Sequence, residues 1–544
     1  MIKSLLRIPG GRWTAAAWLL SLLVTVPLAV ILSAWLQPEW KVWHHLVETV
    51  LGELLLNTLI LTVGIGIGVV VLGVGLAWLT AMCTFPGQRL FDWALILPLA
   101  IPAYVLAFTV LGILDYGGPI QQGLAARFGP QGYWFPNPRS PAMVVTVLTL
   151  TLYPYVYMLA RGAFLSQGRR MLEASRMLGR SPWGAFLHAA LPMARPAIAA
   201  GCALAIMEAL ADFGAVSVFS FNTFTTAIYK AWFGLFNLHA ATQLASLLLL
   251  FICVLLVIER RMRGQARYFA NDGSATNTRI VLHGLPAMLA TCSAATVFTL
   301  AFLLPMGQLL FWAWGAARQD LNSRYWELVG HTLLLGGGAA LVAASGALLL
   351  GIARKRHPFP AVQAAIRIAT LGYAMPGSVL AVGIMLTLVW LDRGISALLQ
   401  GLFASATPGT WISGSILALL FAYLTRFLAV AYGPVESGLE RIRPSILEAA
   451  HGLGSGNREV VRRLYLPILR PSLLTASLLV LVEVMKEMPA TLLLRPFGWD
   501  TLAVRIYEMT SEGEWERAAL PAITLVLVGM VPVILLVRKT ASRQ

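Results

Sequence analysis

The sequence predicts an all-α integral membrane protein with about twelve transmembrane helices, arranged as two parallel six-helix repeats. Three observations lead to this fold class. Hydrophobic residues make up 58% of the 544 residues and charged residues only 12%. Apolar stretches long enough to cross a bilayer recur along the chain, and one polar motif occurs in both halves. A soluble protein of this length could not bury so much apolar surface, so lipid must solvate part of it.

Transmembrane helices are expected wherever about 20 consecutive residues are predominantly apolar, since that length crosses the hydrocarbon core. The first such stretch is too long, and too closely followed by others, for a cleaved signal peptide. The predicted spans are residues 14–36, 54–80, 91–114, 142–165, 197–219, 240–258, 284–312, 331–352, 362–391, 411–432, 472–494 and 517–537.

The basic residues predict the orientation of these spans. Lys3, Arg7 and Arg12 flank the first span and favour a cytoplasmic amino terminus, and twelve spans return the carboxyl terminus to the same side. With this orientation most of the 40 Lys and Arg residues fall in cytoplasmic loops. The net charge of +16 is therefore a topological signal. No nucleic-acid partner is expected, because the basic residues are scattered over many short loops.

Cysteine usage indicates neither a disulfide nor a zinc site. The four cysteines, Cys83, Cys202, Cys253 and Cys292, are isolated in or beside predicted spans, without a Cys-x-x-Cys or Cys/His cluster. No metal-binding residue can be assigned from the sequence, and we expect no cofactor bound by this chain.

An internal repeat relates the two halves. The sequence around Glu173 is LEASRMLGRSPWGAFLHAALPMARP, and around Glu448 it is LEAAHGLGSGNREVVRRLYLPILRP. Within these two stretches matched residues are always 275 positions apart, and no gap is needed, while Pro102–Ala107 resembles Pro376–Ala381 at an offset of 274. Because this offset contains six spans, both halves have the same orientation in the membrane. We expect a first half over 1–258, a cytoplasmic linker over 259–283 and a second half over 284–544.

The repeated segment predicts a short surface helix closed by a glycine. Gly179 and Gly454 are suited to the left-handed turn that ends a helix. A second short helix is expected to stop before Leu-Pro, because the residue ahead of proline avoids helical geometry. An amphipathic helix lying on the membrane is the alternative, although surface anchoring would not require the same spacing twice.

This motif resembles the signature of permease subunits of bacterial ABC importers, which implies a type I permease fold. The second copy fits fully, and the first departs at Ser175 and Ala189. In that family the segment is the coupling helix, which docks into an ATPase subunit. The resemblance assigns this role to Glu173, Ala174, Gly179, Leu191, Pro192, Glu448, Ala449, Ala450, Gly454, Leu466 and Pro467. No Gly-Lys dipeptide occurs, so there is no Walker A loop, and a separate ATPase subunit, expected in two copies, must use the ATP.

Apart from those at span edges, four carboxylates lie within the predicted spans, where charge is costly and a functional role is the first hypothesis. Glu208 and Asp212 match Glu483 and Glu487 at the same offset of 275. One interpretation is that they line a translocation path, since carboxylate oxygens suit hard cations. The other is structural: they pair with Lys486 or with helix-end amides, or hold bends around Phe213-Gly214 and Met488-Pro489.

The stretches ALADFGAVSVFSFNTFTTAIYKAWFG and VEVMKEMPATLLLRPFGWDTLAVRIYE are similar to those of fused permeases for ferric iron import. This resemblance implies an inner-membrane permease that receives ferric iron from a periplasmic binding protein. Thiamine, sulfate and phosphonate permeases share the motif and stay open as alternatives. An ion-coupled secondary transporter would leave both motifs unexplained, and the dispersed histidines do not favour a membrane enzyme. Loops 220–239 and 495–516 either face the binding protein or are solvated connectors.

Overall fold

The computed structural model describes residues 11–36, 38, 40–129, 134–177, 179, 181–263, 279–403 and 409–541. Within these ranges the chain is helical apart from connecting segments and one short parallel strand pair, β1 (Cys83–Thr84) with β2 (Ile280–Val281). Most of the expected linker, residues 264–278, lies outside the described residues.

The helices up to residue 263 are α2 (Gly11–Ser33), η1 (Ala34–Leu36), α3 (Trp40–Thr49), α4 (Leu51–Met82), α5 (Gln88–Ala94), η2 (Leu97–Ala100), α6 (Ala103–Leu114), α7 (Pro119–Phe128), α8 (Pro141–Met177), α9 (Pro182–Ala185), η3 (Phe186–Ala190), α10 (Leu191–Ala211), α11 (Gly214–Val218), α12 (Phe224–Tyr229), η4 (Lys230–Gly234) and α13 (Leu238–Arg263).

The later helices are α14 (Leu285–Phe298), η5 (Thr299–Leu303), α15 (Leu304–Asp320), α16 (Ser323–Arg356), α17 (Pro360–Ala369), η6 (Thr370–Ala374), α18 (Gly377–Leu402), α19 (Ile416–Glu440), α20 (Pro444–Gly452), α21 (Asn457–Val460), η7 (Val461–Tyr465), α22 (Leu466–Lys486), α23 (Pro489–Leu494), α24 (Leu502–Ser511) and α25 (Trp515–Ala541).

The described residues include eleven helices that are long and apolar enough to cross a membrane. Each overlaps one of the predicted spans. The twelfth predicted span, 517–537, falls on α25, whose side chains are described only in part. The predicted all-α membrane class is therefore confirmed.

Four predicted spans are not single helices, which corrects the boundaries drawn from hydropathy. Two of them break ahead of Pro102 and Pro376, where Ile101 and Met375 take extended geometry, with ψ of 116° and 130°. This geometry is what a following proline imposes. The other two break after α10 and α22. The four interrupted spans are those predicted at 91–114, 362–391, 197–219 and 472–494.

The described chain divides into two compact units that cut across the sequence repeat. Unit 1 contains Met1–Trp40, Ile228–Ser246 and Leu321–Tyr507, and unit 2 contains Lys41–Ala227, Leu247–Asp320 and Glu508–Gln544. Each unit therefore combines a core from one half with the first helix of the other half and one further part of that other half, Ile228–Ser246 in unit 1 and Glu508–Gln544 in unit 2.

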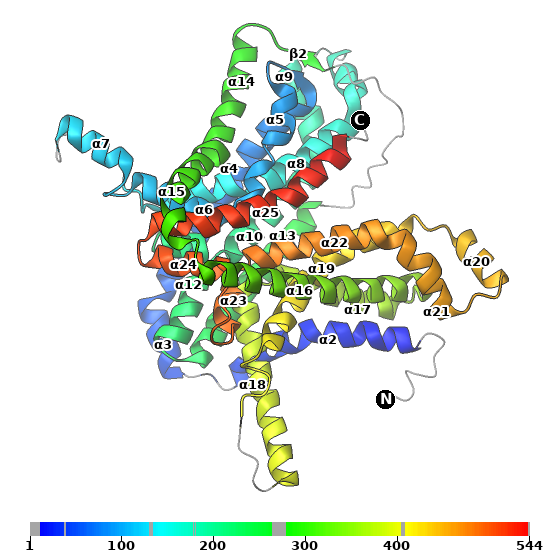
Figure 1. Cartoon of the computed structure of the whole chain (residues 1–544). Coiled ribbons are helices and arrows are strands. Elements are labelled where there is room, and N and C mark those ends of the chain that lie inside the picture. Colours follow the sequence, from blue (N-terminus) through cyan, green and yellow to red (C-terminus); the bar gives the residue numbers. More distant parts are fainter. Residues whose placement is uncertain are drawn as a thin grey trace. The chain divides into compact units, whose positions relative to one another are not determined.

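The exchange of first helices is visible in the packing of each unit. In unit 1, α2 lies against α16, α17 and α18 of the second half (Figure 1). In unit 2, α15 of the second half packs against α25 and contacts α6 of the first half. Small residues allow the closest approaches, as is common between membrane helices. At both Gly73 and Gly201 an added Cβ would lie 2.7 Å from an atom of Val156, so α4 and α10 both approach α8 closely.

Candidate coupling and gating sites

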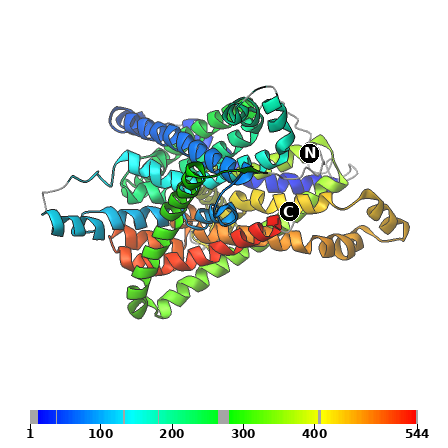
Figure 2. The ribbon, with the colours of Figure 1, turned by 90° about the horizontal axis from the view of Figure 1, so that it is seen from above.

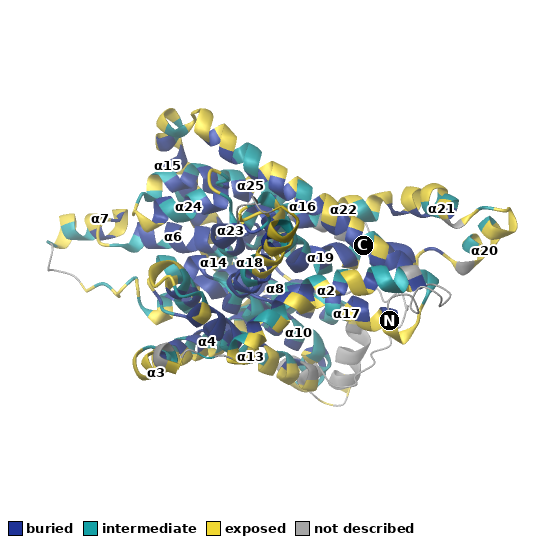
Figure 3. Ribbon diagram, turned by 90° about the horizontal axis from the view of Figure 1, so that it is seen from below, coloured by how far each residue is buried: buried dark blue, intermediate teal, exposed yellow. Residues whose placement is uncertain are grey.

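The second copy of the repeated motif forms an exposed helical hairpin at one end of α22. Glu448, Ala449 and Ala450 lie on α20, and the chain then turns through Gly454, whose φ is +81°. The side chain of Leu453 is 86% exposed. In two perpendicular views α20 and α21 extend beyond the end of α22 (Figure 1 and Figure 2), and most of their residues are exposed (Figure 3).

The first copy has the same backbone turn. Glu173 and Ala174 lie on the last turns of the long helix α8, although the side chains of residues 167–176 lie outside the described set. After this helix ends, Gly179 also has a φ of +81°. The prediction that Gly179 and Gly454 provide left-handed turns after a helix is confirmed. The predicted separate short helix is present only in the second copy, as α20, because in the first copy Glu173 lies on the continuous helix α8.

The prediction that a second short helix stops before Leu-Pro is wrong. Leu191 and Pro192 begin α10, and Leu466 and Pro467 begin α22, each directly continuous with the helix before it. A π-helical turn, η3 or η7, precedes Leu-Pro in both copies. Such a turn widens the helix by one residue. The wider turn accommodates the proline ring, which would otherwise clash with the carbonyl four residues earlier.

Asp212 and Glu487 occupy equivalent positions at the helix breaks. The Asp212 carboxylate accepts hydrogen bonds from the backbone N–H groups of Ala215 (2.7 Å) and Val216 (3.3 Å), at the start of α11. The Glu487 carboxylate accepts one from Ala490 (3.0 Å), at the start of α23. Because Ala215 and Ala490 are 275 positions apart, the same amide is capped in both repeats. This geometry agrees with the structural interpretation, in which these residues hold a bend.

Glu487 also forms a buried ion pair that the sequence did not indicate. Arg426 on α19 lies 3.3 Å from its carboxylate, and both residues are less than a tenth exposed. Gly377, the first residue of α18, lies against this pair, and a Cβ there would collide with both charged groups. The first half has Thr151 and Ala103 at the repeat-matched positions. In the first half, therefore, the carboxylate is the shorter Asp212, the position of Arg426 holds the uncharged Thr151, and alanine replaces glycine at the helix start.

The remaining spanning carboxylates lie one turn earlier on α10 and α22. Glu483 forms an ion pair of 2.7 Å with Lys486 on the same helix, and both are partly exposed. Glu208 is partly buried on α10. Glu208 and Asp212 belong to unit 2, and Glu483 and Glu487 to unit 1. The described residues include no group of three or more His, Cys, Asp or Glu side chains that could hold a metal ion.

The loop after α23 is braced and presents one apolar side chain. Arg495 and Asp500 form an ion pair of 2.8 Å across it, and Trp499 stacks on His331 with ring centroids 4.4 Å apart. Phe497 at its tip is fully exposed. The loop therefore presents an exposed aromatic side chain between two anchored positions.

Comparisons with known proteins match both halves. Residues 70–264 and 346–544 match the family described as "Binding-protein-dependent transport system inner membrane component". An Fe(3+)-transport system permease protein of Haemophilus influenzae is 28% identical over 89% of this chain and 90% of its own length. A ferric transport system permease protein of Actinobacillus pleuropneumoniae is 23% identical over 87% of this chain and 69% of its own length.

A shorter similarity links the chain to a molybdenum transport system permease protein of Escherichia coli. The two are 31% identical over 150 residues, which are 28% of this chain and 63% of that protein. The resemblance to fused ferric permeases that the sequence motifs indicated is thus confirmed over most of the chain.

Proposed function

Because the chain belongs to the family of binding-protein-dependent transport system inner membrane components, we propose that it is the membrane permease of an ATP-driven importer for ferric iron. The observation that carries this proposal is the pair of coupling segments, each turning through a glycine with a φ of +81°. The substrate is taken from the relatives that match nearly the whole chain, which are named for ferric transport.

The two segments suit a partner with two equivalent sockets, and two ATPase copies are the simplest match to an internal repeat. Leu453 on the exposed hairpin supplies an apolar contact for a socket. From this segment the chain continues without interruption through η7 into α22. A movement of the ATPase would therefore be transmitted along a continuous helix to the break at Glu487.

The helix breaks are the proposed gate. In each half a long helix stops at a carboxylate and restarts as a short helix whose first amides that carboxylate caps. Asp212 and Glu487 hold the break. Glu208 and Glu483 lie one turn before it, on the side of the coupling segment, and Lys486 directly precedes Glu487. Strong ligation by these carboxylates is not required, because a tight trap would slow release of the cation.

The remaining partners follow from the orientation predicted by the basic residues. Both termini and both coupling segments are cytoplasmic, so the ATPases bind there and use the ATP. The braced loop with Phe497 then lies on the periplasmic side, where the binding protein delivers iron. Its exposed aromatic tip is suited to a docking contact.

Two other functions can be separated from this one. A permease for another small solute is supported by the similarity to the molybdenum permease, which covers 28% of the chain. A secondary transporter driven by an ion gradient would need no repeated docking segment. The similarity over the whole chain therefore favours the ferric substrate.

Uptake of radiolabelled ferric iron tests the proposal. Cells without their own ferric uptake would carry this permease, its ATPase and its binding protein. Iron should accumulate only when all three are present, and an ATPase with its phosphate-loop lysine replaced should abolish accumulation. Accumulation of molybdate, sulfate or thiamine without iron would contradict the substrate, and uptake without the ATPase would contradict the mechanism.

A further inference from the structure

A basic pocket lies within unit 1 where the second coupling segment joins α22, and residues 458–466 of that segment supply much of its lining. Its volume is about 1340 Å³, larger than the roughly 300–1,000 Å³ of most small-ligand pockets. Four arginines and one glutamate line it, together with Trp13 and small or aliphatic side chains. Neither the proposed coupling role nor the gate accounts for this excess of positive charge.

The pocket is where three membrane-spanning helices reach the same end. The apolar spans begin at Trp13, end at Arg356 and begin again near Arg458, and all three of these residues line the pocket. A site at the boundary between apolar span and polar flank lies at the level of the lipid headgroups. Trp13 is suited to that layer, because indole rings concentrate at membrane interfaces.

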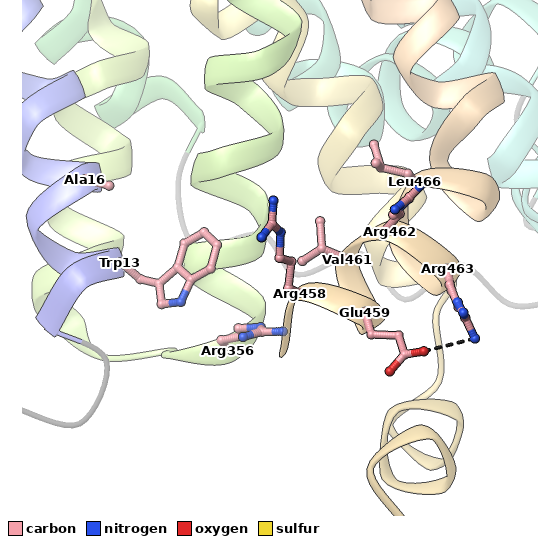
Figure 4. A pocket seen from close by; sticks show the side chains of 9 residues that line it. All are labelled: Trp13, Ala16, Arg356, Arg458, Glu459, Val461, Arg462, Arg463 and Leu466. Carbon is pink, nitrogen blue, oxygen red and sulfur yellow. Dashed lines mark ion pairs between the residues drawn. The ribbon is translucent and has the colours of Figure 1, made fainter. Parts of the chain in front are cut away.

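The side chains divide the pocket into two parts. The Arg356 guanidinium lies 5.5 Å from the centre of the Trp13 ring. On the other side Glu459 and Arg463 form an ion pair of 2.9 Å. Figure 4 shows Arg458 between these two groups. Arg458 and Arg462 are exposed, and neither has an acidic partner among the described residues.

The neighbouring cations on α16 are already engaged. Arg354 pairs with Glu436, and the Lys355 ammonium donates to the carbonyl of Ile442 at 3.1 Å. Arg356 points instead toward Trp13 and the pocket (Figure 4). Three of the four arginines that line the pocket, Arg458, Arg462 and Arg463, therefore come from the segment ahead of α22, and Arg356 comes from the end of α16.

We propose that this pocket binds the headgroup of an anionic phospholipid from the surrounding membrane. Guanidinium groups hold phosphate oxygens with two parallel hydrogen bonds, and basic pockets between membrane helices on the cytoplasmic side suit such headgroups. Trp13 and Val461 provide apolar walls where the acyl chains begin. The lipid would join the start of α2 to the segment that leads into α22. This inference does not depend on the identity of the transported solute.

Native mass spectrometry of the purified full-length chain tests the proposal by titration with phosphatidylglycerol or phosphatidylcholine. Wild type should bind phosphatidylglycerol selectively. The Arg458→Gln/Arg462→Gln variant should bind it about thirtyfold more weakly, because each basic residue near an anionic headgroup raises the affinity about fivefold. Arg458→Lys/Arg462→Lys should keep most of the affinity. Phosphatidylglycerol should also raise the Tm of wild type more than that of the glutamine variant.

The matched control is Arg441→Gln/Arg443→Gln, which removes two exposed charges nearby that do not line the pocket. An equal loss in this control would mean general attraction to the membrane and would overturn the site. Equal binding of phosphatidylcholine, or displacement of phosphatidylglycerol by an equimolar amount of inorganic phosphate, would also overturn it. If Arg458→Gln/Arg462→Gln lost its association with the ATPase but bound phosphatidylglycerol like wild type, the pocket would be a protein-docking surface and the lipid proposal would be wrong.

Discussion

At Gly377, the absence of a side chain makes room for the buried ion pair between Arg426 and Glu487. The pair lies at the start of α18, against the break between α22 and α23. Removing two charges from water is costly, and the pair is retained only where the surrounding packing keeps it together. The Glu487 carboxylate also accepts the amide hydrogen of Ala490, so one residue joins three helix ends.

We expect Gly377→Ala to destabilise the purified permease by about 1–3 kcal/mol, because the new methyl group must displace the ion pair. Thermal unfolding in detergent would show a lower Tm. Gly394→Ala on the same helix is the control, since a Cβ there meets nothing within 4 Å. Equal stability of the two variants would mean that the ion pair moves aside without loss.

At the scale of elements, the repeat preserves irregular features as well as helices. The left-handed glycine, the π-helical turn before Leu-Pro and the capped break after the long helix occur at matched positions in both halves. Between the glycine and the break, the second half is one continuous helical path from α21 to α22. Each feature has a local physical cause, yet together they connect the exposed hairpin to the helix break.

We expect Gly454→Ala to weaken association with the ATPase about fivefold to thirtyfold. An L-residue in the left-handed region costs about 1–2 kcal/mol, so the native turn is populated correspondingly less. No atom lies within 4 Å of the added Cβ, which leaves backbone strain as the cause. Co-purification with the ATPase measures the effect.

Gly456→Ala is the control for that experiment, because Gly456 also has open space and has no positive φ. If both alanine variants bind the ATPase like wild type, the turn at Gly454 does not position the docking segment.

At the scale of the whole molecule, the first helix of each half completes the compact unit built on the other half. In unit 1 this exchange places Ile31 of α2, which has no exposed surface, against α18. A Cβ at Gly383 would lie 2.8 Å from the Ile31 side chain and 2.9 Å from the carbonyl oxygen of Pro27. The fused chain therefore links the halves through packing within each unit as well as through the linker.

We expect Ile31→Ala to lower stability by about 2 kcal/mol, near the low end for a truncated buried isoleucine. The value is low because lipid also solvates an apolar side chain when the helices separate, so mainly contacts and packing are lost. Leu32→Ala is the control, since Leu32 is 56% exposed on the same helix. Thermal unfolding in detergent distinguishes the two, and equal Tm values would contradict the packing of α2 on α18.

Several features could be predicted from residues close together in sequence. Long apolar stretches indicated the membrane class, and the constant offset of 275 indicated two parallel halves. Gly179 and Gly454 were predicted as left-handed turns because a glycine follows a helical pattern at both places. The breaks at Pro102 and Pro376 were missed, since these stretches stay apolar across the interruption and hydropathy does not register a change of backbone direction. The bends after α10 and α22 were one of two interpretations of the carboxylates.

The hydropathy, the repeat and the glycine turns are local properties, so the order of residues was enough to establish the membrane class, the two halves and the turns in the repeated segment. The tertiary structure alone decided that Arg426 meets Glu487, that α2 packs on the second half, and that Trp13, Arg356 and Arg458 share one pocket. The physical reason is that lipid solvates every apolar helix face about equally well. Which faces meet is therefore determined by shape, small residues and buried polar groups that are distant in sequence.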